Sequence, residues 1–466
     1  MKIFDNRAQK TKYKVLREVA IQTWKSNDAF DVFNEIANKI AVKGEPPISC
    51  CIYKDRAIIA DRIRIALGKY IGEKNTIQVV TIACDECPRS GHIVTDICRG
   101  CLAHNCVEAC PKDAIIIDNK QRAHIDKNKC IECGRCAKAC RYNAITNQKR
   151  PCESACKTNA ITMNENGESY IIPEKCIVCG ACVWECPFGA LLDVSSMVDV
   201  IKSIMDKQEK EEIFAIIAPA VATQYPKATI GQITAGIKKL GFTQVREVAM
   251  GADIVAIEEA KELLEKGMLT SSCCPAFVEY ININFPELRH LVSSNISPMT
   301  ATGKLIKEKH PDAKVVFIGP CTAKKWEKQC QPASNYIDYV LTFEELQAMF
   351  DSKNIDLSTL DEEELNDASP YGRGFAISGG VSKAIAEALK ELGHEEFEFK
   401  PVICNGLDEC KKALTSAKFG KLDGNFIEGM ACEGGCVMGN ASLTSKEKPE
   451  FAVSKYCMSS KKESLR

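Results

Sequence analysis

Cysteine is the residue type whose spacing most clearly implies chemistry in this chain. The 466 residues include 27 cysteines, and two runs have the spacing C-x2-C-x2-C-x3-C, with which bacterial ferredoxins bind [4Fe–4S] cubes. A third and a fourth cysteine at these positions fit a cube better than a zinc ribbon, and CxxC spacings in a long chain favour metal sites over disulfides. The predicted cluster ligands in these runs are Cys130, Cys133, Cys136 and Cys140, and Cys176, Cys179, Cys182 and Cys186.

Eight more cysteines surround these runs. One set has a longer middle spacing, C-x2-C-x4-C-x3-C, and consists of Cys98, Cys101, Cys106 and Cys110. The other set combines a CxxC with a distant CxxxC, and consists of Cys84, Cys87, Cys152 and Cys156. The set of Cys84, Cys87, Cys152 and Cys156 either holds a fourth cube, binds zinc or consists of free thiols. We therefore predict three or four accessory [4Fe–4S] clusters that form an electron wire, and the spacing leaves open which fourth cysteine crosses to which cluster.

Three further cysteine motifs lie far apart in the sequence: TSSCCPAF at 270–277, GPCTAKKWE at 319–327 and EGMACEGGCVMG at 428–439. Cys432 and Cys436 are four residues apart, one above the other if the segment is helical. With one cysteine from each of the other motifs they would surround a fourfold metal site. Gly434 and Gly435 allow close approach of the backbone to a cluster, and Lys324 supplies positive charge and hydrogen bonds to anionic ligands.

These three motifs closely resemble the L1, L2 and L3 signatures of [FeFe] hydrogenases, over about residues 213–445, and an upstream ferredoxin segment is also usual in that family. The resemblance implies reversible oxidation of H2 and reduction of protons at an H-cluster. This cofactor is a [4Fe–4S] cube joined through one cysteine thiolate to a two-iron unit with CO, CN⁻ and azadithiolate ligands. The implied cube ligands are Cys274, Cys321, Cys432 and Cys436, of which Cys436 is shared with the two-iron unit.

The resemblance also assigns residues around the two-iron unit. Cys273 corresponds to the proton-handling thiol, Lys324 to the residue that holds a cyanide, and Met430 to a residue packed nearby. A family Ala-Pro-Ser element near the other cyanide matches three consecutive residues, Ala218, Pro219 and Ala220. Because alanine replaces the serine, one side-chain hydrogen bond is missing.

A proton path is the last site that the resemblance implies. The family's path runs from the cysteine through water, Glu, Ser and Glu to Arg, and the matching positions are Glu259, Ser293, Glu262 and, in place of the arginine, Lys266. Glu259 and Glu262 are three apart on one helical face, as a relay needs. Without the resemblance, the same residues are typical of a solvated helix face.

Several positions depart from the best-studied members. Residues 276–277 are Ala-Phe in place of Gly-Trp, residues 319–320 are Gly-Pro in place of Met-Pro, and residues 440–443 are Asn-Ala-Ser-Leu in place of Gly-Gly-Gln-Pro. This set is similar to the group B branch. It bears on turnover rate, catalytic bias and oxygen response more than on the cluster, because the cube ligands, Cys273 and Lys324 are all present.

Charge and composition limit the partners. The formal net charge is −1, which gives no global electrostatic case for nucleic acid or a membrane surface. No apolar run approaches the ~20 residues of a membrane span, and the first residues lack the apolar core of a signal peptide, so we expect a cytoplasmic protein. The partners implied by the resemblance are H2 and protons, ferredoxin or a similar carrier, and maturation proteins for the two-iron unit. The alternatives are an H2 or redox sensor, and a multi-cluster electron-transfer or cluster-assembly protein.

Hydrophobic periodicity predicts the elements that position these residues. Strand-type runs at 213–220, 315–318 and 401–404 alternate with helical patterns at 230–240, 253–266, 298–309 and 381–392, which predicts parallel β units. Helices are also expected at 14–24, 31–40 and 55–67, with Cys50 and Cys51 as packing residues. The predicted fold is an α/β catalytic domain around a buried H-cluster, a ferredoxin-like α+β domain and a small helical N-terminal region. The predicted boundaries are 1–80 for the helical region, 81–195 for the iron–sulfur segment, 196–445 for the catalytic domain and 446–466 for a surface tail.

Overall fold

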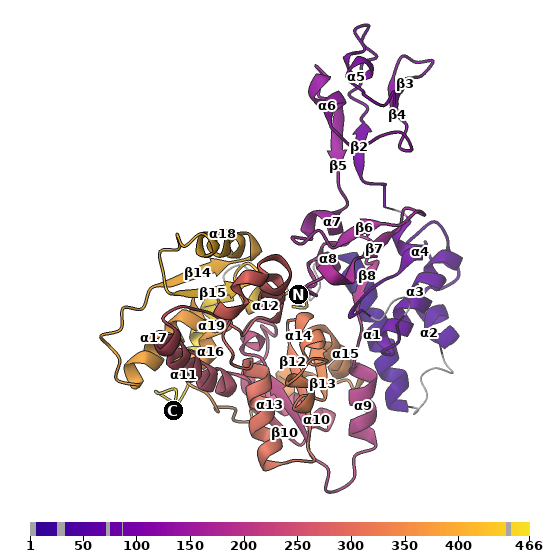
Figure 1. Ribbon diagram of the computed structural model, residues 1–466. Helices are drawn as coiled ribbons and strands as arrows, with labels where there is room; N and C mark the ends of the chain where they lie inside the picture. Colours follow the sequence, from indigo (N-terminus) through magenta and orange to yellow (C-terminus); the bar gives the residue numbers. More distant parts are fainter. Residues whose placement is uncertain (1–5, 26–32, 71–74, 86, 444–448) are drawn as a thin grey trace.

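The computed structural model describes residues 6–25, 33–70, 75–85, 87–443 and 449–466, and its catalytic domain is built on a four-stranded parallel sheet (Figure 1). The strand order β10–β9–β12–β13 corresponds to Gln244–Glu247, Ile213–Ile217, Lys314–Gly319 and Tyr339–Thr342. Every residue of β9 is buried, as expected for a parallel strand with helices on both faces. The predicted parallel β units with covering helices are therefore confirmed.

Side chains of β9 alternate between two hydrophobic cores. Ala215 and Ile217 pack with α10 (Ile230–Leu240) and α15 (Phe343–Ser352), whereas Phe214 and Ile216 pack with α13 (Pro298–Lys309) on the other face. This period of two is the consequence of strand geometry. The sheet is thus a rigid layer between helices, and its loops are held in fixed positions.

A second parallel sheet, with the order β11–β15–β14, lies beside the first. Its strands are Leu269–Thr270, Phe426–Met430 and Pro401–Asn405. Helices α11 (Ala249–Lys266) and α17 (Gly380–Glu391) pack on one face, around Phe426 and Met430. Helices α12 (Pro275–Asn284) and α18 (Leu407–Lys418) cover Ile427 on the other face.

The iron–sulfur segment consists of two modules of the same design, one inserted into the other. The outer module pairs β1 (Ile77–Val79) with β8 (Leu191–Asp193) and β6 (Ile161–Met163) with β7 (Ser169–Ile171). The inserted module pairs β2 with β5 and β3 with β4, and Figure 1 shows that it projects from the body. Its strands and helices are β2 (Gly91–Val94), α5 (Asn105–Glu108), β3 (Ile115–Ile117), β4 (Ala123–Ile125), α6 (Arg135–Ala139) and β5 (Ile145–Gln148).

The short helices of the outer module show where the insertion lies. They are α4 (Thr81–Cys84), α7 (Pro151–Ala155) and α8 (Ala181–Glu185), and the inserted module interrupts the chain between α4 and α7. In the inserted module, four residues separate Cys101 from Cys106. The corresponding connection of the outer module, from Cys87 to Cys152, carries the whole second module.

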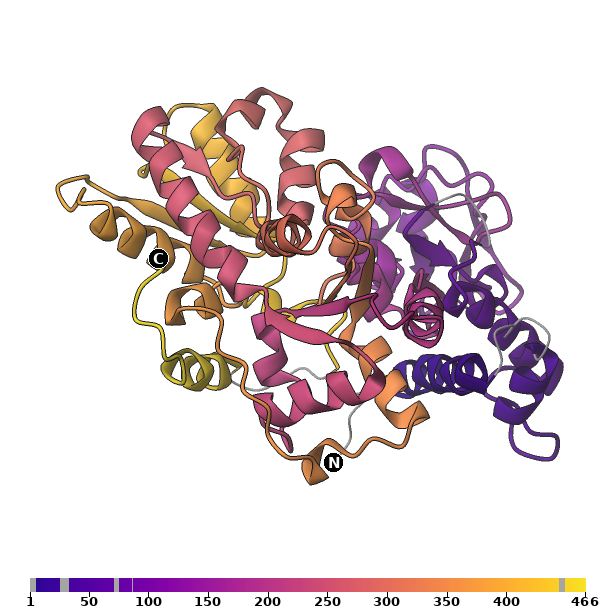
Figure 2. The ribbon, with the colours of Figure 1, turned by 90° about the horizontal axis from the view of Figure 1, so that it is seen from below.

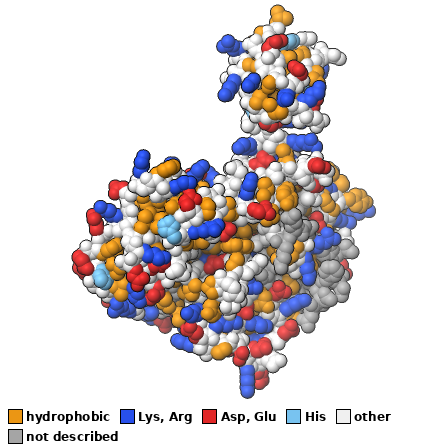
Figure 3. All heavy atoms as spheres, viewed as in Figure 1, with side chains coloured by type: hydrophobic (Ala, Val, Ile, Leu, Met, Phe, Trp, Pro, Cys, Tyr) orange, Lys and Arg blue, Asp and Glu red, His pale blue; other side chains and the backbone are white. Residues whose placement is uncertain are grey.

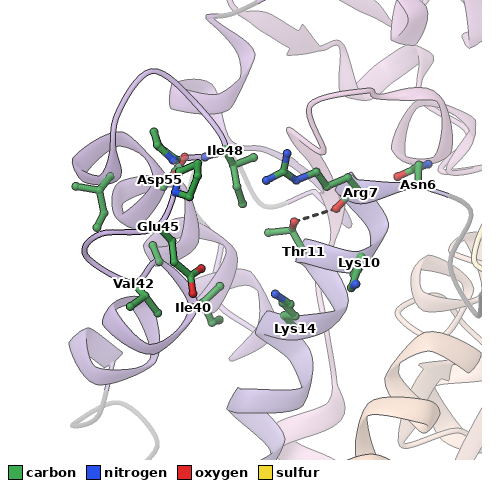
Figure 4. A pocket seen from close by; sticks show the side chains of 14 residues that line it. Asn6, Arg7, Lys10, Thr11, Lys14, Ile40, Val42, Glu45, Ile48 and Asp55 are labelled. Atoms are coloured by element: carbon green, nitrogen blue, oxygen red, sulfur yellow. Dashed lines mark hydrogen bonds between the residues drawn. The ribbon is translucent and has the colours of Figure 1, made fainter.

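The N-terminal region is helical, as predicted: α1 (Arg7–Lys25), α2 (Phe33–Ile40) and α3 (Ile52–Ala66) lie against the body on the side of the iron–sulfur modules (Figure 2). The beginning of the helix predicted at 31–40 lies outside the described residues. Cys50 is exposed, contrary to the packing role expected for it. Between α1 and the segment after α2 is a cavity of about 450 Å³ (Figure 4), whose lining residues all fall between 6 and 55. It includes Arg7 and Lys14 and none of the cysteine motifs.

One buried cluster of charged side chains joins these regions. The Lys325 ammonium lies 2.6 Å from a carboxylate oxygen of Asp193 and 2.9 Å from one of Glu345, and Lys12 of α1 lies 2.9 Å from Asp193. Helix α9 (Met197–Met205) bridges the outer module and the catalytic domain. The N-terminal helix, the outer module and the catalytic domain therefore meet at shared charges.

The C-terminal residues differ from the predicted surface tail. Helix α19 (Pro449–Met458) buries Val453 and Tyr456, and the Tyr456 carbonyl accepts a hydrogen bond from Arg373. Arg373, in α16 (Pro370–Gly374), is 1% exposed and pairs with Glu247 at 2.8 Å. The many charged residues of this segment suggested a solvated tail, but a few apolar side chains are enough to dock the helix.

Candidate active site

The predicted catalytic segments all follow the carboxyl ends of parallel strands. Residues 218–220 follow β9 and residues 271–274 follow β11. Residues 320–321 follow β12, and residues 431–436 follow β15. These strands belong to two sheets that lie side by side. Because the carboxyl ends of parallel strands meet at one edge of each sheet, and functional loops of open α/β folds lie there, segments up to 218 residues apart in number converge where these edges adjoin.

Four thiols from three motifs lie together at this edge. Burial raises the pKa of Cys321 to about 11 and that of Cys436 to about 12, and negative charge on the neighbouring Cys274 adds to both shifts. Burial likewise raises the pKa of Cys432, with contributions from Cys321 and Cys274. Binding to the positively charged core of an iron–sulfur cluster is what converts such a mutually repelling group of thiols into thiolate ligands. The donor set therefore fits a [4Fe–4S] cube.

Glycines fold the third motif back on itself. The segment after β15 is a turn that ends in the 3-10 helix Cys436–Met438, so a continuous helix is not what brings Cys432 near Cys436. Gly434 and Gly435 have φ values of +85° and +87°, in the region that favours glycine. A side chain on Gly435 would lie 2.8 Å from the Ala376 carbonyl, so this glycine allows two backbone segments to pack together.

Lys324 is held rigidly beside Cys273. Its ammonium, in α14 (Ala323–Glu327), is 2.6 Å from a Glu327 oxygen and donates to the Cys273 carbonyl at 3.2 Å. Glu327 in turn accepts hydrogen bonds from Ser297 and Thr300. Burial alone would lower the pKa of Lys324, but Glu327 and nearby thiols raise it above its ordinary value. The site therefore contains a fixed positive charge.

The remaining predicted residues of the two-iron environment line the same strand ends. Met430 is 2% exposed at the end of β15. The Ala218 amide donates to the Ile318 carbonyl at 2.9 Å, which holds residues 218–220 beside the second motif. Ala220 is fully buried and its side chain has no hydrogen-bonding group, so the serine hydroxyl usual in the family has no substitute from this position.

The four predicted proton-path residues lie near one another and lead away from Cys273. Glu259 is fully buried, and one of its oxygens accepts hydrogen bonds from the Ser272 amide and hydroxyl, each at 3.1 Å. Its other oxygen makes no hydrogen bond within the described part of the chain. Burial raises the pKa of Glu259 to about 7, and a negative charge on Glu259 contributes to the raised pKa of Cys273. Ser272 is a residue that the motif analysis missed, since only its position next to Cys273 marks it.

Beyond Glu259 the chain continues to the surface. The Ser293 hydroxyl lies beside Glu259 and donates to Glu262 at 2.9 Å. Glu262 also accepts from Lys266 at 2.6 Å. Although burial opposes ionisation, these hydrogen bonds lower the pKa of Glu262. The Lys266 side chain is 41% exposed, so the chain of polar groups reaches solvent.

The accessory cysteines form four groups, and each group takes one cysteine from a neighbouring run. Three groups line separate cavities: Cys98, Cys101, Cys106 and Cys140; Cys110, Cys130, Cys133 and Cys136; and Cys156, Cys176, Cys179 and Cys182. Charges on Cys84 and Cys186 both contribute to the raised pKa values of Cys87 and Cys152, which places these four together. This arrangement is the crossing that the spacing alone left open.

The Cys156 group adjoins the cysteines predicted to hold the catalytic cube. The Thr322 hydroxyl, next to Cys321, donates to the Val178 carbonyl at 2.8 Å, and the Asn440 side chain donates to the Cys179 carbonyl at 2.9 Å. Asn440 is one of the departures from the best-studied motif. Its amide thus ties the third motif to an accessory group.

Fold and cysteine sets together define an iron–sulfur protein in which a multi-cluster segment adjoins a site at the strand ends of an α/β domain. Residues 211–440 match the family described as "Iron only hydrogenase large subunit, C-terminal domain", and residues 123–146 and 169–192 match the 4Fe-4S binding domain. The chain belongs to the iron-only, or [FeFe], hydrogenase family, and the family resemblance of its motifs is confirmed.

Similar proteins include hydrogenases and proteins of another function. Iron hydrogenase 1 of Clostridium pasteurianum is 30% identical over 386 residues, 71% of this chain and 66% of that protein. The periplasmic [Fe] hydrogenase large subunit of Nitratidesulfovibrio vulgaris is 29% identical over 290 residues, 50% of this chain and 69% of that protein. The cytosolic Fe-S cluster assembly factor NAR1 of Kluyveromyces lactis is 34% identical over 94 residues, 20% of each chain. The solved [FeFe]-hydrogenase HydA1 of Chlamydomonas reinhardtii aligns with a TM-score of 0.48 and 23% identity over 58% of this chain and 90% of that chain.

Proposed function

We propose that this protein catalyses reversible oxidation of H2 and reduction of protons, and that it exchanges the electrons with a ferredoxin-type carrier. The observation that carries this proposal is the position of Cys273. It lies between the four convergent cysteines and a buried chain of polar groups that leads from Glu259 to the surface at Lys266. An electron-transfer protein needs the cysteines but has no use for a proton path that starts beside them.

The residues present fit an H-cluster. Cys274, Cys321, Cys432 and Cys436 would hold the cube, with Cys436 shared with the two-iron unit. Lys324 and Met430, together with residues 218–220, would surround that unit. When bound, the two-iron unit supplies the site at which H2 is split or formed and the electrons enter or leave. Lys324 fits a cyanide because its charge is fixed by Glu327 at 2.6 Å.

The chain's own residues move the proton. The raised pKa of Cys273 keeps its thiol protonated between transfers, so it passes protons without accumulating charge. Glu259, with a pKa of about 7, accepts or returns a proton near neutral pH, which is the range in which a general acid–base group works best. Glu262 is ionised at rest beside Lys266, so it can accept the proton that passes through Ser293 and then release it to solvent.

Four cubes in a row would carry the electrons. The cavity of the Cys98 group is lined by Val94, at the end of β2 that is far from the body. The cavity of the Cys110 group is lined by His92, which lies closer to the point where β2 joins the body. The Cys84 group follows at the junction, and the Cys156 group adjoins the catalytic cysteines. This order predicts entry at the tip of the inserted module.

The surface of the inserted module suits a small acidic carrier such as ferredoxin. Residues 91–148 contain nine Lys or Arg and six Asp or Glu, and Figure 3 shows basic and hydrophobic side chains together on this projection. Its exposed large hydrophobic side chains are Ile97, Leu102, Ile116, Ile131 and Tyr142. Maturation proteins for the two-iron unit and a cytoplasmic location remain predictions. No helix in the described ranges is long and apolar enough to cross a membrane.

Infrared spectroscopy of the matured protein, combined with an H2 uptake and evolution assay, tests the proposal. We expect CO and CN⁻ bands and turnover in both directions. Absence of those bands after loading with a synthetic two-iron cofactor would refute it and would favour a second candidate, an electron-transfer or cluster-assembly protein, which the similarity to NAR1 motivates. Bands with negligible turnover would favour an H2 or redox sensor.

A further inference from the structure

A buried arginine lies at the point where the inserted module joins the outer one. Arg150 is the residue just before α7 and is 2% exposed. Its guanidinium donates to the carbonyls of Cys87 at 3.0 Å and Pro88 at 2.9 Å. These carbonyls belong to the segment that leads into the inserted module, whereas Arg150 belongs to the segment that leads out. One side chain therefore joins the two connections.

The same guanidinium contacts a predicted cluster ligand. One of its terminal nitrogens lies 3.6 Å from the Cys84 sulfur and 3.2 Å from the Ser169 hydroxyl. The Cys84 sulfur also accepts the Ser169 amide at 3.2 Å. Burial raises the pKa of Cys87, and the nearby charge of Arg150 offsets part of that rise. Positive charge and two hydrogen-bond donors are thus directed at the Cys84, Cys87, Cys152 and Cys186 group.

No carboxylate among the described residues pairs with the charge of Arg150. Within the described residues Arg150 makes no ion pair, because Glu153 accepts only its backbone amide, at 3.3 Å. An ionised side chain that is buried without an opposite charge is costly. An iron–sulfur cube with four thiolate ligands carries net negative charge, so a cube at this group would supply the missing partner.

We propose that Arg150 is a positioning residue that raises the reduction potential of the cube held by the Cys84 group, at the junction between the two modules. Net charge and hydrogen bonds to the sulfurs set the potentials of such cubes. Reduction adds one electron to the cube, and the guanidinium stabilises this more negative state. The inference rests on the proposed function, because it assumes that the Cys84 group holds a cube.

The test is a redox titration of the full-length chain, reconstituted with iron and sulfide and followed by electron paramagnetic resonance. Arg150→Gln removes the charge, and Arg150→Lys keeps the charge but not the planar fork. Arg89→Gln is the matched control, because Arg89 lies on the same connection and is exposed. We expect one cube of R150Q to titrate at lower potential, R150K to lie between R150Q and the unaltered protein, and R89Q to match the unaltered protein.

The affected signal is identified by its absence from a Cys84→Ser, Cys87→Ser double variant. Unchanged potentials in both Arg150 variants, or an equal shift in R89Q, would overturn the inference. If R150Q loses the cube, the test depends on R150K, whose cube must then have a lower reduction potential than the same cube of the unaltered chain. Iron analysis of the unaltered chain distinguishes failure of this inference from failure of the proposed function. A chain with fewer than about sixteen accessory irons has no fourth cube, whatever potentials the Arg150 variants show.

Discussion

Replacement of Glu259 by glutamine separates the proton path from the stability of the fold. Glutamine has nearly the same shape, and its carbonyl oxygen can still accept the Ser272 amide at the position of the carboxylate oxygen, 3.1 Å away. It cannot take up and release a proton at neutral pH. We expect Glu259→Gln to lower turnover by about 10²- to 10⁴-fold, the usual contribution of a general acid–base group.

The same substitution should raise the stability of the folded protein at pH 8, although it lowers turnover. Burial raises the pKa of Glu259 from 4.5 to about 7, which corresponds to about 3 kcal/mol at ~1.4 kcal/mol for each pH unit. Since the folded state holds this proton more tightly than the unfolded chain, stability falls as pH rises from about 4.5 to about 7 and stays lower above it. The glutamine variant lacks this loss. At pH 8 it should therefore be more stable than the unaltered protein, by up to about 3 kcal/mol.

The assays are H2 evolution and oxidation across pH 5.5–8.5, infrared spectra, and denaturant unfolding at pH 5 and pH 8. In the unaltered protein, H2 oxidation should rise with pH through about 7, because Glu259 must be deprotonated to accept a proton. The variant should lose this dependence and keep its CO and CN⁻ bands. Glu258→Gln is the control, since Glu258 is exposed and pairs with Lys261 on the same helix. Normal turnover in the Glu259 variant would refute the path, and a less stable variant at pH 8 would refute the assignment of a raised pKa.

Two other predictions concern thiols. Cys273→Ser should keep the cofactor and its infrared bands but lose nearly all turnover, because a hydroxyl is far less acidic than a thiol of pKa ~8.5; H2 evolution near the normal rate would contradict the relay role. The Cys84→Ser, Cys87→Ser double variant should lose about four irons and keep the infrared bands of the two-iron unit. Cys186→Ser should weaken the same cube, because Cys186 is grouped with these cysteines. Unchanged iron content in the double variant would show that this group holds no cube.

Local pattern predicted the catalytic domain well. The strands at 213, 315 and 401 and the helices between them follow from the hydrophobic pattern of each segment. The cysteine motifs suggested a shared metal site, but the choice of Cys274 over Cys273 came only from the family resemblance, because sequence spacing carries no information about which strand ends are neighbours. The parallel order β11–β15–β14 is what brings two of the motifs together.

The nested modules were beyond local prediction for a physical reason. A ferredoxin fold pairs its first strand with its last, and here these are β1 and β8, which are 112 residues apart at Val79 and Leu191. The sixteen accessory cysteines suggest one continuous segment, and only the pairing of β1 with β8 and of β2 with β5 separates two folds. The grouping of Cys84 with Cys186, in place of Cys156, is a consequence of that pairing.

The insertion also constrains how the wire can work. The chain enters the inserted module through residues 87–90 and leaves it through residues 149–151. There Arg150 donates to the Pro88 carbonyl, and Glu153 accepts from the Ser90 hydroxyl. The covalent connection and the proposed electron path therefore share one junction. The opposite end adjoins the catalytic cysteines through Thr322 and Asn440. If electrons enter at the projecting tip, both contacts lie on their route, so a change at either one should slow electron delivery without altering the infrared signature of the catalytic site.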